Sequence, residues 1–219
     1  MSRRGAKGAG VGRGVIVLAG EDANDCQILA EFIKAHHPGL GDAKIVRIND
    51  PVRLKKKTGA TLEENVRVLV GKAKGRALRE KGPLVGFAVH EDLDDYAGNR
   101  YRTVRQAVSA ELSRQCPAEA AYALAAWESE SWLLLFPEAF AQVRPKWKVP
   151  AQLRGKDTGL IDSPKEKLKR GLGSPSFRES DGPAIAKKAL EKGLLTAPVG
   201  RNTSHSDLVA ELAHWPTHT

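Results

Sequence analysis

Short apolar runs alternate with longer amphipathic segments along the first two-thirds of the chain. Four of these runs have the length and composition of strands: VIVLAG at 15–20, KIVRIN at 44–49, PLVGFAVH at 83–90 and AAYALAAW at 120–127. The first has the pattern of a strand buried on both faces. Between them, apolar positions recur at helical spacing over 22–38, 61–82 and 101–116. This alternation predicts an α/β fold with a mostly parallel sheet flanked by helices.

Two of the predicted helices carry start signals. Asp22 stands where an N-cap residue would precede a helix that begins near residue 24. Thr61 and Glu64 have the spacing of a capping box, which predicts that the next helix begins at Thr61.

The pattern changes near residue 145, where proline, glycine and lysine become frequent. Short helices are expected at 163–170, 182–192 and 204–213. We therefore expect a flexible basic tail over 1–13, an α/β domain over 14–144, and a small, basic helical extension over 145–219 that packs on that domain.

Composition narrows the classes of partner and site. The 219 residues include 35 Lys and Arg against 26 Asp and Glu, and the formal net charge of +9 favours a polyanion such as nucleic acid, although solubility alone explains many basic surfaces. The two cysteines lack the spacing of a structural zinc site. No apolar stretch is long enough to cross a bilayer and no signal peptide is evident, so we expect a cytoplasmic protein without a membrane partner.

Acidic residues follow three of the four predicted strands. Because parallel strands end at the same edge of a sheet, we expect these carboxylates to share one cleft. The acids are Glu21, Asp22 and Asp25 after the first strand, Glu91, Asp92, Asp94 and Asp95 after the third, and Glu128 and Glu130 after the fourth.

Such a cluster repels itself unless a cation neutralises it. All-carboxylate ligands favour Mg²⁺ or Mn²⁺, and two such ions would support in-line attack on a phosphodiester. The alternative is that Asp22 only caps a helix, the role that we assign to it, and that EDLDD is a solvated turn. The pattern of residues does not distinguish Glu128 from Glu130 as the metal ligand.

The acidic motifs resemble those of the Toprim domain, a compact, Rossmann-like α/β fold of topoisomerases, primases and OLD-family nucleases. GEDAND supplies Glu21 and Asp25 of the first motif, with Asp22 where glycine is usual, and Asp92 and Asp94 match its Asp-x-Asp motif. The resemblance implies that Glu21 is the general acid or base and that the two aspartates bind Mg²⁺.

Later segments are similar to an uncharacterised bacterial Toprim-like family found near defence genes. These are ESWL at 130–133, DSPKEKL at 162–168 and, more loosely, SHSDLVAEL at 204–212, so the resemblance spans 15–212. It favours Glu130 over Glu128 as a metal ligand. It also implies a Mg²⁺-dependent nuclease, or a related phosphoryl-transfer enzyme, of antiviral or mobile-element defence. The partner that we expect is nucleic acid, DNA ahead of RNA, although the sequence does not separate DNA, RNA and nucleotide substrates, and an ATPase subunit is a second candidate partner.

Several other side chains have a functional and a structural interpretation. Lys165 either reaches a phosphate or is a solvated surface lysine, and His90 either relays protons or is buried with its ring hydrogen-bonded. Trp127 and Trp132 either stack on a base or belong to the core. The run Lys55 to Lys57 either contacts phosphates or lies in a solvated loop.

The expected function is metal-dependent hydrolysis of a phosphodiester, with Glu21 as the base, Lys165 as a further catalytic candidate, and metal ligands among Glu21, Asp25, Asp92, Asp94, Glu128 and Glu130. A second hypothesis keeps the fold without catalysis, as a binding or sensor subunit of a defence complex. A third, a phospho-receiver-like domain, requires a lysine at the end of a late strand, which the sequence lacks.

Overall fold

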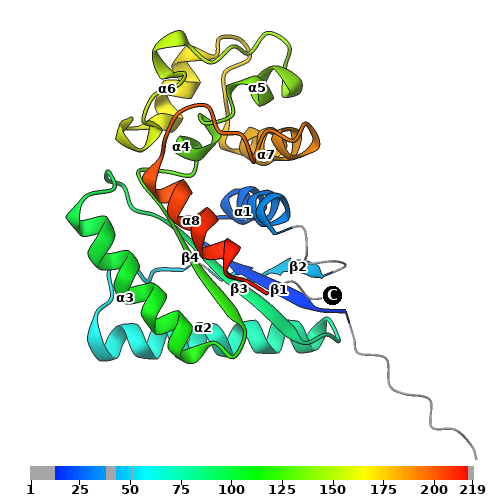
Figure 1. Ribbon diagram of the computed structural model, residues 1–219, viewed down its shortest axis with the longest axis vertical. Coiled ribbons are helices and arrows are strands. Elements are labelled where there is room, and N and C mark those ends of the chain that lie inside the picture. Colours follow the sequence, from blue (N-terminus) through cyan, green and yellow to red (C-terminus); the bar gives the residue numbers. More distant parts are fainter. Residues whose placement is uncertain (1–12, 38–42, 51, 217–219) are drawn as a thin grey trace, which may run out of the picture.

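Four parallel strands form a single sheet in the order β2-β1-β3-β4 (Figure 1). The computed structural model describes residues 13–37, 43–50 and 52–216. The strands are β1 (Val15–Ala19), β2 (Lys44–Arg47), β3 (Leu84–Asp92) and β4 (Glu119–Ala125). Each neighbouring pair is parallel, so the predicted α/β class with a parallel sheet is confirmed.

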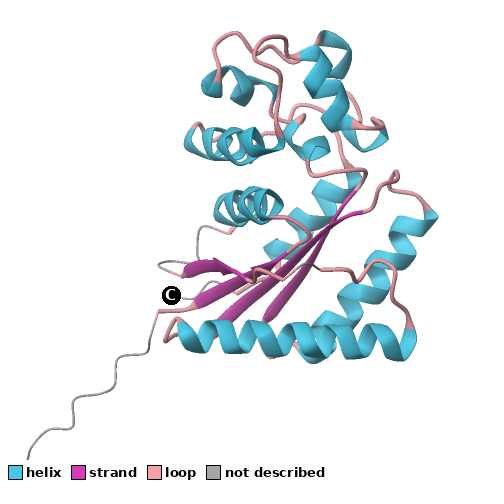
Figure 2. Cartoon of the chain, turned by 180° about the vertical axis from the view of Figure 1, so that it is seen from behind, coloured by secondary structure: helices cyan, strands magenta, loops and turns pink. Residues whose placement is uncertain are grey.

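Helices cover both faces of the sheet, as Figures 1 and 2 show. One face carries α1 (Ala23–His36) and α8 (Thr203–Ala213), and the other carries α2 (Gly59–Arg79) and α3 (Asn99–Gln115). Successive side chains of a strand point to opposite faces. In β1, Ile16 and Leu18 join the core under α1, whereas Val15 and Val17 join the core under α2.

Short helices form a further layer beyond β4, in the upper part of Figure 1. They are α4 (Glu130–Leu133), α5 (Pro137–Val143), α6 (Pro164–Gly171) and α7 (Gly182–Glu191), with 3-10 turns η2 (Ala151–Leu153), η3 (Thr158–Leu160) and η4 (Glu179–Asp181). The helices expected at 163–170, 182–192 and 204–213 are confirmed within one residue at each end.

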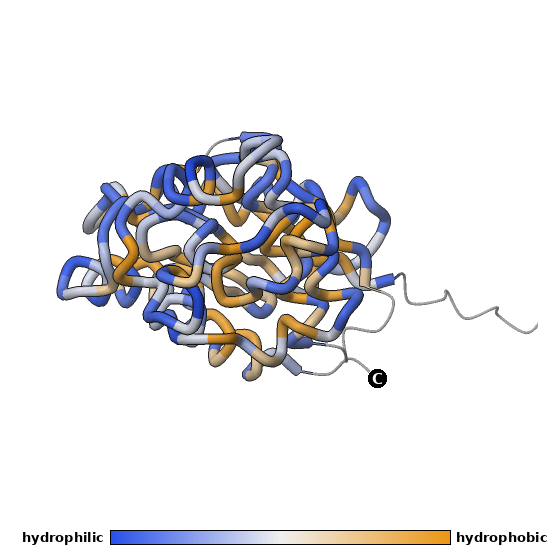
Figure 3. The backbone as a smooth tube through the Cα atoms, turned by 90° about the horizontal axis from the view of Figure 1, so that it is seen from above, coloured by the Kyte–Doolittle hydropathy of each residue, from blue (hydrophilic) through white to orange (hydrophobic). Residues whose placement is uncertain are grey.

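One hydrophobic core joins residues on both sides of position 145. Trp147, Leu168 and Ile185 share a buried cluster with Ile16 and Trp132. Figure 3 shows hydrophobic positions concentrated in the middle of the fold. The basic tail expected over 1–13 lies outside the described residues except for its last position. Within the described ranges, no helix combines the length and the apolar character needed to cross a membrane.

The sequence predicts the start of α1 correctly and the start of α2 incorrectly. Asp22 caps α1 as predicted, since its Oδ1 accepts a hydrogen bond from the backbone N–H of Asn24 at 2.5 Å. The capping box at Thr61 is wrong. The helix already begins at Gly59, so Thr61 lies inside its first turns, and the carboxylate of Glu64 is paired with Arg67 instead.

Aromatic rings fill the space between α1, α4 and α8. The ring of His205 lies 5.2 Å from Phe32 and 5.8 Å from Phe136, and burial lowers the pKa of this histidine to about 3. Trp132 is fully buried in the same group, where its indole N–H donates to Ser204 Oγ at 2.8 Å. This tryptophan is therefore a core residue and does not stack on a base.

Candidate metal centre

Acidic side chains from three strand ends line one cavity of about 140 Å³. Of the residues predicted to form the site, the structure brings five together here, and Asp94 and Glu128 are not among the lining residues. The cavity is lined by Glu21, Asp22, Asn24, Asp25, Ile28, Asp92, Glu130, Lys165 and Glu179.

The alternation of β3 selects which side chains face this cavity. His90 and Asp92 point to the side of the sheet that α1 covers, where Asp25 stands in the first turn of that helix. One potential ligand atom from each of these three residues lies within 4.8 Å of the others, so the three side chains could hold a metal ion. The imidazole Nδ1 lies 3.8 Å from Asp25 Oδ2, and Nε2 lies 3.7 Å from Asp92 Oδ1.

His90 has no exposed surface, and neither of its ring nitrogens has a hydrogen-bond partner within the described part of the chain. Its predicted burial is confirmed, and its predicted hydrogen bond is wrong because the nearest polar groups are carboxylates beyond hydrogen-bonding distance. Burial also lowers the pKa of His90, which keeps the ring neutral. A neutral, unpartnered imidazole nitrogen between two carboxylates is a suitable metal ligand.

The carboxylates themselves are held in an environment that penalises their charge. Burial, then the charges of Asp25 and Glu130, raise the pKa of Asp92 well above its ordinary value. Burial likewise raises the pKa of Glu130 to about 7. Ser129 fixes the geometry, because its backbone N–H donates to Asp92 Oδ1 at 3.1 Å and its hydroxyl donates to Asp25 Oδ1 at 2.7 Å.

Lys55 provides a cation at the outer side of the cluster, a contact that the sequence did not indicate. Its Nζ lies 3.0 Å from Glu21 Oε1 and 3.0 Å from Asp94 Oδ2, and it donates to the main-chain oxygen of Asp92. The side chain is only 8% exposed, so the solvated-loop interpretation is wrong for this lysine. Burial acts to lower the pKa of Lys55, but its hydrogen bonds to Asp94 and Glu21 outweigh burial and raise it.

Glu91 holds the loop that carries Lys55. This buried carboxylate lies on the opposite side of β3 from His90, and it accepts hydrogen bonds from the backbone N–H groups of Leu54 at 2.9 Å and Lys55 at 3.0 Å. The hydroxyl of Tyr122 donates to the same oxygen at 2.9 Å. Burial raises the pKa of Glu91. The other oxygen, Oε1, accepts from the same backbone N–H of Lys55 at 3.2 Å, so both oxygens are occupied and the role of Glu91 is to position the loop.

The remaining acids are satisfied by local partners. Glu128 accepts from the backbone N–H of Lys165 at 3.1 Å and lies 3.5 Å from its Nζ, which in turn lies 3.4 Å from Glu179. Asp95 accepts from the backbone N–H of Tyr96 at 2.8 Å, as expected for an acid in a turn. Of the two glutamates that the sequence could not separate, only Glu130 lines the cavity.

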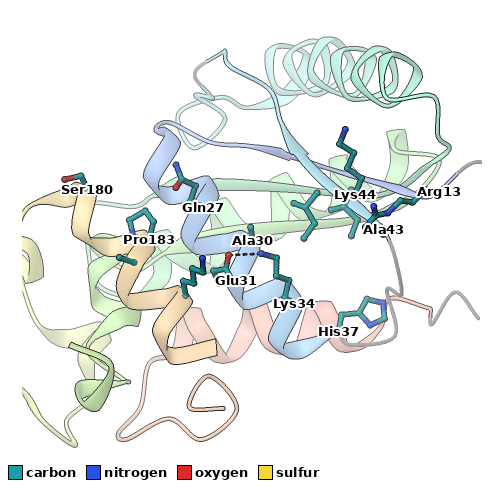
Figure 4. Close-up of a pocket in the computed structure, with 14 residues that line it drawn as sticks. Arg13, Gln27, Ala30, Glu31, Lys34, His37, Ala43, Lys44, Ser180 and Pro183 are labelled. Carbon is teal, nitrogen blue, oxygen red and sulfur yellow. Dashed lines mark hydrogen bonds and ion pairs between the residues drawn. The ribbon is translucent and has the colours of Figure 1, made fainter. Parts of the chain in front are cut away.

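A larger cavity, of about 1050 Å³, lies between α1, α7 and the edge strand β2 (Figure 4). Its charged lining includes Lys34, which pairs with Glu31 at 2.7 Å, and Lys187. None of the strand-end acids lines this cavity. The acidic cluster therefore belongs to the smaller cavity at the carboxyl edge of the sheet.

No family model, curated protein or solved structure matches the chain. The Toprim likeness thus stays a prediction drawn from the motifs. The donor set can be assessed directly: Asp25, Asp92 and Glu130 supply hard oxygen ligands, and His90 supplies one nitrogen. Such a set of oxygen and nitrogen donors could hold a divalent metal ion.

Proposed function

We propose that the chain is a Mg²⁺- or Mn²⁺-dependent phosphodiesterase that cleaves nucleic acid. The observation that carries this proposal is the set of Asp25, His90 and Asp92, in which a buried imidazole without a hydrogen-bond partner lies between two partly buried carboxylates. Buried charges of one sign are costly, and a divalent cation is the simplest group that would offset them.

The ion would be held by these three residues together with Glu130. When bound, it would polarise a phosphoryl oxygen and lower the pKa of a water molecule. Glu21 is 37% exposed, and only its Oε1 is paired with Lys55, so its second oxygen is available to accept a proton from the attacking water. Lys165 lines the same cavity and would stabilise negative charge on the phosphate or the leaving group.

Charge outside the cavity supports a polyanionic substrate. Residues 144–201 contain fourteen Lys and Arg against six Asp and Glu. Contacts of lysine and arginine to phosphates give affinity without reading sequence. DNA as the preferred substrate, a role in antiviral or mobile-element defence, and an ATPase partner subunit are proposed from the resemblance alone.

Cleavage of labelled DNA and RNA by the purified protein with Mg²⁺ or Mn²⁺ tests the proposal. We expect metal-dependent cleavage that falls at least about 100-fold in Glu21→Gln and in Asp92→Asn, as expected for loss of a general base or a metal ligand. Glu138→Gln, an exposed glutamate of α5, is the matched control and should cleave normally. Cleavage that survives in both site variants would contradict the proposal.

One observation favours the second candidate, a binding or sensor subunit without catalysis. Lys55 already neutralises Glu21 and Asp94, two of the acids that the Toprim resemblance assigns to chemistry, and Asp22 stands where that motif has glycine. This candidate predicts no cleavage by the wild-type protein with either metal. It also predicts that Asp92→Asn binds DNA as tightly as the wild type does.

A further inference from the structure

We propose that the ammonium of Lys55 takes the place of a second metal ion, so that the centre binds one divalent cation. This inference rests on the proposed function, because it concerns the same cluster of acids. It goes further by dividing that cluster into an outer part neutralised by the protein itself and an inner part that requires an ion.

The outer part already has a cation, the ammonium of Lys55. Glu21, Asp94 and the main-chain oxygen of Asp92 all accept from the same ammonium group, which has three N–H donors in total. Asp94 reaches this position because its backbone adopts a left-handed conformation with φ 59°, and its side chain is 68% exposed. Two of the acids that the sequence predicts as metal ligands, Glu21 and Asp94, are therefore bound to Lys55 in this outer part.

Lys55 is held in this position by the fold. Its own backbone N–H and that of Leu54 donate to the carboxylate of Glu91, which Tyr122 fixes from β4. The next residue, Lys56, is exposed and makes no hydrogen bond or ion pair within the described structure. The fold thus holds the ammonium of Lys55 in a fixed position and leaves that of Lys56 in solvent.

The inner part lacks such a partner. Within the described ranges, no lysine or arginine forms an ion pair with Asp25, Asp92 or Glu130, and the ring of His90 between the first two has no hydrogen-bond partner. On the far side, Lys165 is engaged by Glu128 and Glu179.

Ions of a two-metal site lie roughly 3.5–4 Å apart. A second ion on the Glu21 side of the first would use Glu21 or Asp94 as a ligand, and both already pair with the ammonium of Lys55 at 3.0 Å, whose charge would repel that ion. The predicted occupant of the inner part is a single divalent cation, with Mn²⁺ preferred over Mg²⁺ because one ligand is an imidazole.

Titration calorimetry of the metal-stripped protein with Mn²⁺, supported by the Mn²⁺ electron paramagnetic resonance signal, measures the stoichiometry directly. We expect one Mn²⁺ per chain in the wild type. In Lys55→Met we expect a second ion, and tighter binding of the first by at least about tenfold, because removing a unit charge at about the 4 Å spacing of a two-metal site has at least this effect on a divalent ion at the dielectric of water.

Lys56→Met is the matched control, and Lys55→Arg retains the charge; both should bind one ion with an affinity close to that of the wild type. Circular dichroism and the melting temperature establish that each variant is folded. If Lys55→Met does not fold, the wild-type stoichiometry and the Lys55→Arg titration still decide the question.

Two bound ions in the wild type, or one ion of unchanged affinity in Lys55→Met, would overturn the role of Lys55 and leave the proposed function standing. No bound Mn²⁺ in the wild type would overturn the metal centre and this inference together. One bound ion without cleavage of any nucleic acid would support the single-ion centre and contradict the proposed function.

Discussion

Replacing Asp92 by asparagine should stabilise the metal-free protein. The ligand oxygens of Asp25 and Asp92 lie within 4.8 Å of each other in a partly buried cluster. At an effective dielectric constant of about 20, two unit charges at that separation repel each other by about 3.5 kcal/mol. Asparagine removes this repulsion and keeps an oxygen that accepts the backbone N–H of Ser129. Water in the cavity screens part of the repulsion, and the raised pKa of Asp92 lets a proton relieve more of it as the pH falls. We therefore expect a gain of about 1–3 kcal/mol that is largest at alkaline pH, where both carboxylates are ionised.

For a chain of this size, that gain raises the melting temperature by roughly 3–10 °C. Scanning calorimetry in the presence of a chelator measures it. The same experiment with Mn²⁺ should stabilise the wild type by about 2.7 kcal/mol at a hundredfold excess over Kd, and should not stabilise Asp92→Asn. Asp50→Asn is the matched control: its side chain is 57% exposed and pairs with Lys72 at the surface, so its melting temperature should barely change.

The reasoning would be refuted if Asp92→Asn melted below the wild type without metal. Such a result would mean that the carboxylate of Asp92 is stabilised by its neighbours. It would also be refuted if Mn²⁺ stabilised the variant and the wild type equally, since the ion would then bind elsewhere.

Three further predictions concern the fold. Burial lowers the pKa of His205 to about 3 from an ordinary value near 6.5. The contribution of this histidine to the free energy of unfolding is therefore complete above about pH 6.5 and is lost as the pH falls toward 3. In urea unfolding, the wild type should lose about 2 kcal/mol more stability than His205→Phe between pH 7.5 and pH 5. Gly86→Ala should cost about 1–3 kcal/mol in the same assay, because its Cβ would lie 2.6 Å from the ring of Trp215, and an unchanged midpoint would contradict this packing. Tyr122→Phe should cost about 1–3 kcal/mol by removing a donor from buried Glu91, and a neutral effect would argue against the loop anchor.

The architecture could be predicted because its signals are local. A buried parallel strand has the sequence of a short, continuous apolar run. Residues 15–19 form such a run, and their side chains are buried on both faces of the sheet. The meeting of the acids also follows from the sequence once the strands are known to be parallel, because Asp92 ends β3 and Glu21 and Glu130 follow the ends of β1 and β4. The family resemblance is untested by any of these observations.

The details of the site could not be predicted because distant residues decide them. Nothing local separates Lys55 from the two lysines after it; Glu91, 36 positions away, selects it through backbone hydrogen bonds. Glu128 and Glu130 are equally plausible from their spacing, and the backbone of Lys165, 37 positions from Glu128, removes that residue from the cavity. The helix start at Gly59 was missed because Thr61 and Glu64 match the pattern of a capping box, whereas Thr61 lies inside the helix and the carboxylate of Glu64 pairs with Arg67.

The central claim is that Asp25, His90 and Asp92 bind one divalent metal ion at the carboxyl edge of the sheet. Anomalous diffraction near the manganese edge, from crystals soaked in Mn²⁺, tests it most directly. The account predicts a single anomalous peak within bonding distance of His90 and at least one of the two aspartates. No peak at this cavity, with Mn²⁺ bound elsewhere or not at all, would contradict it.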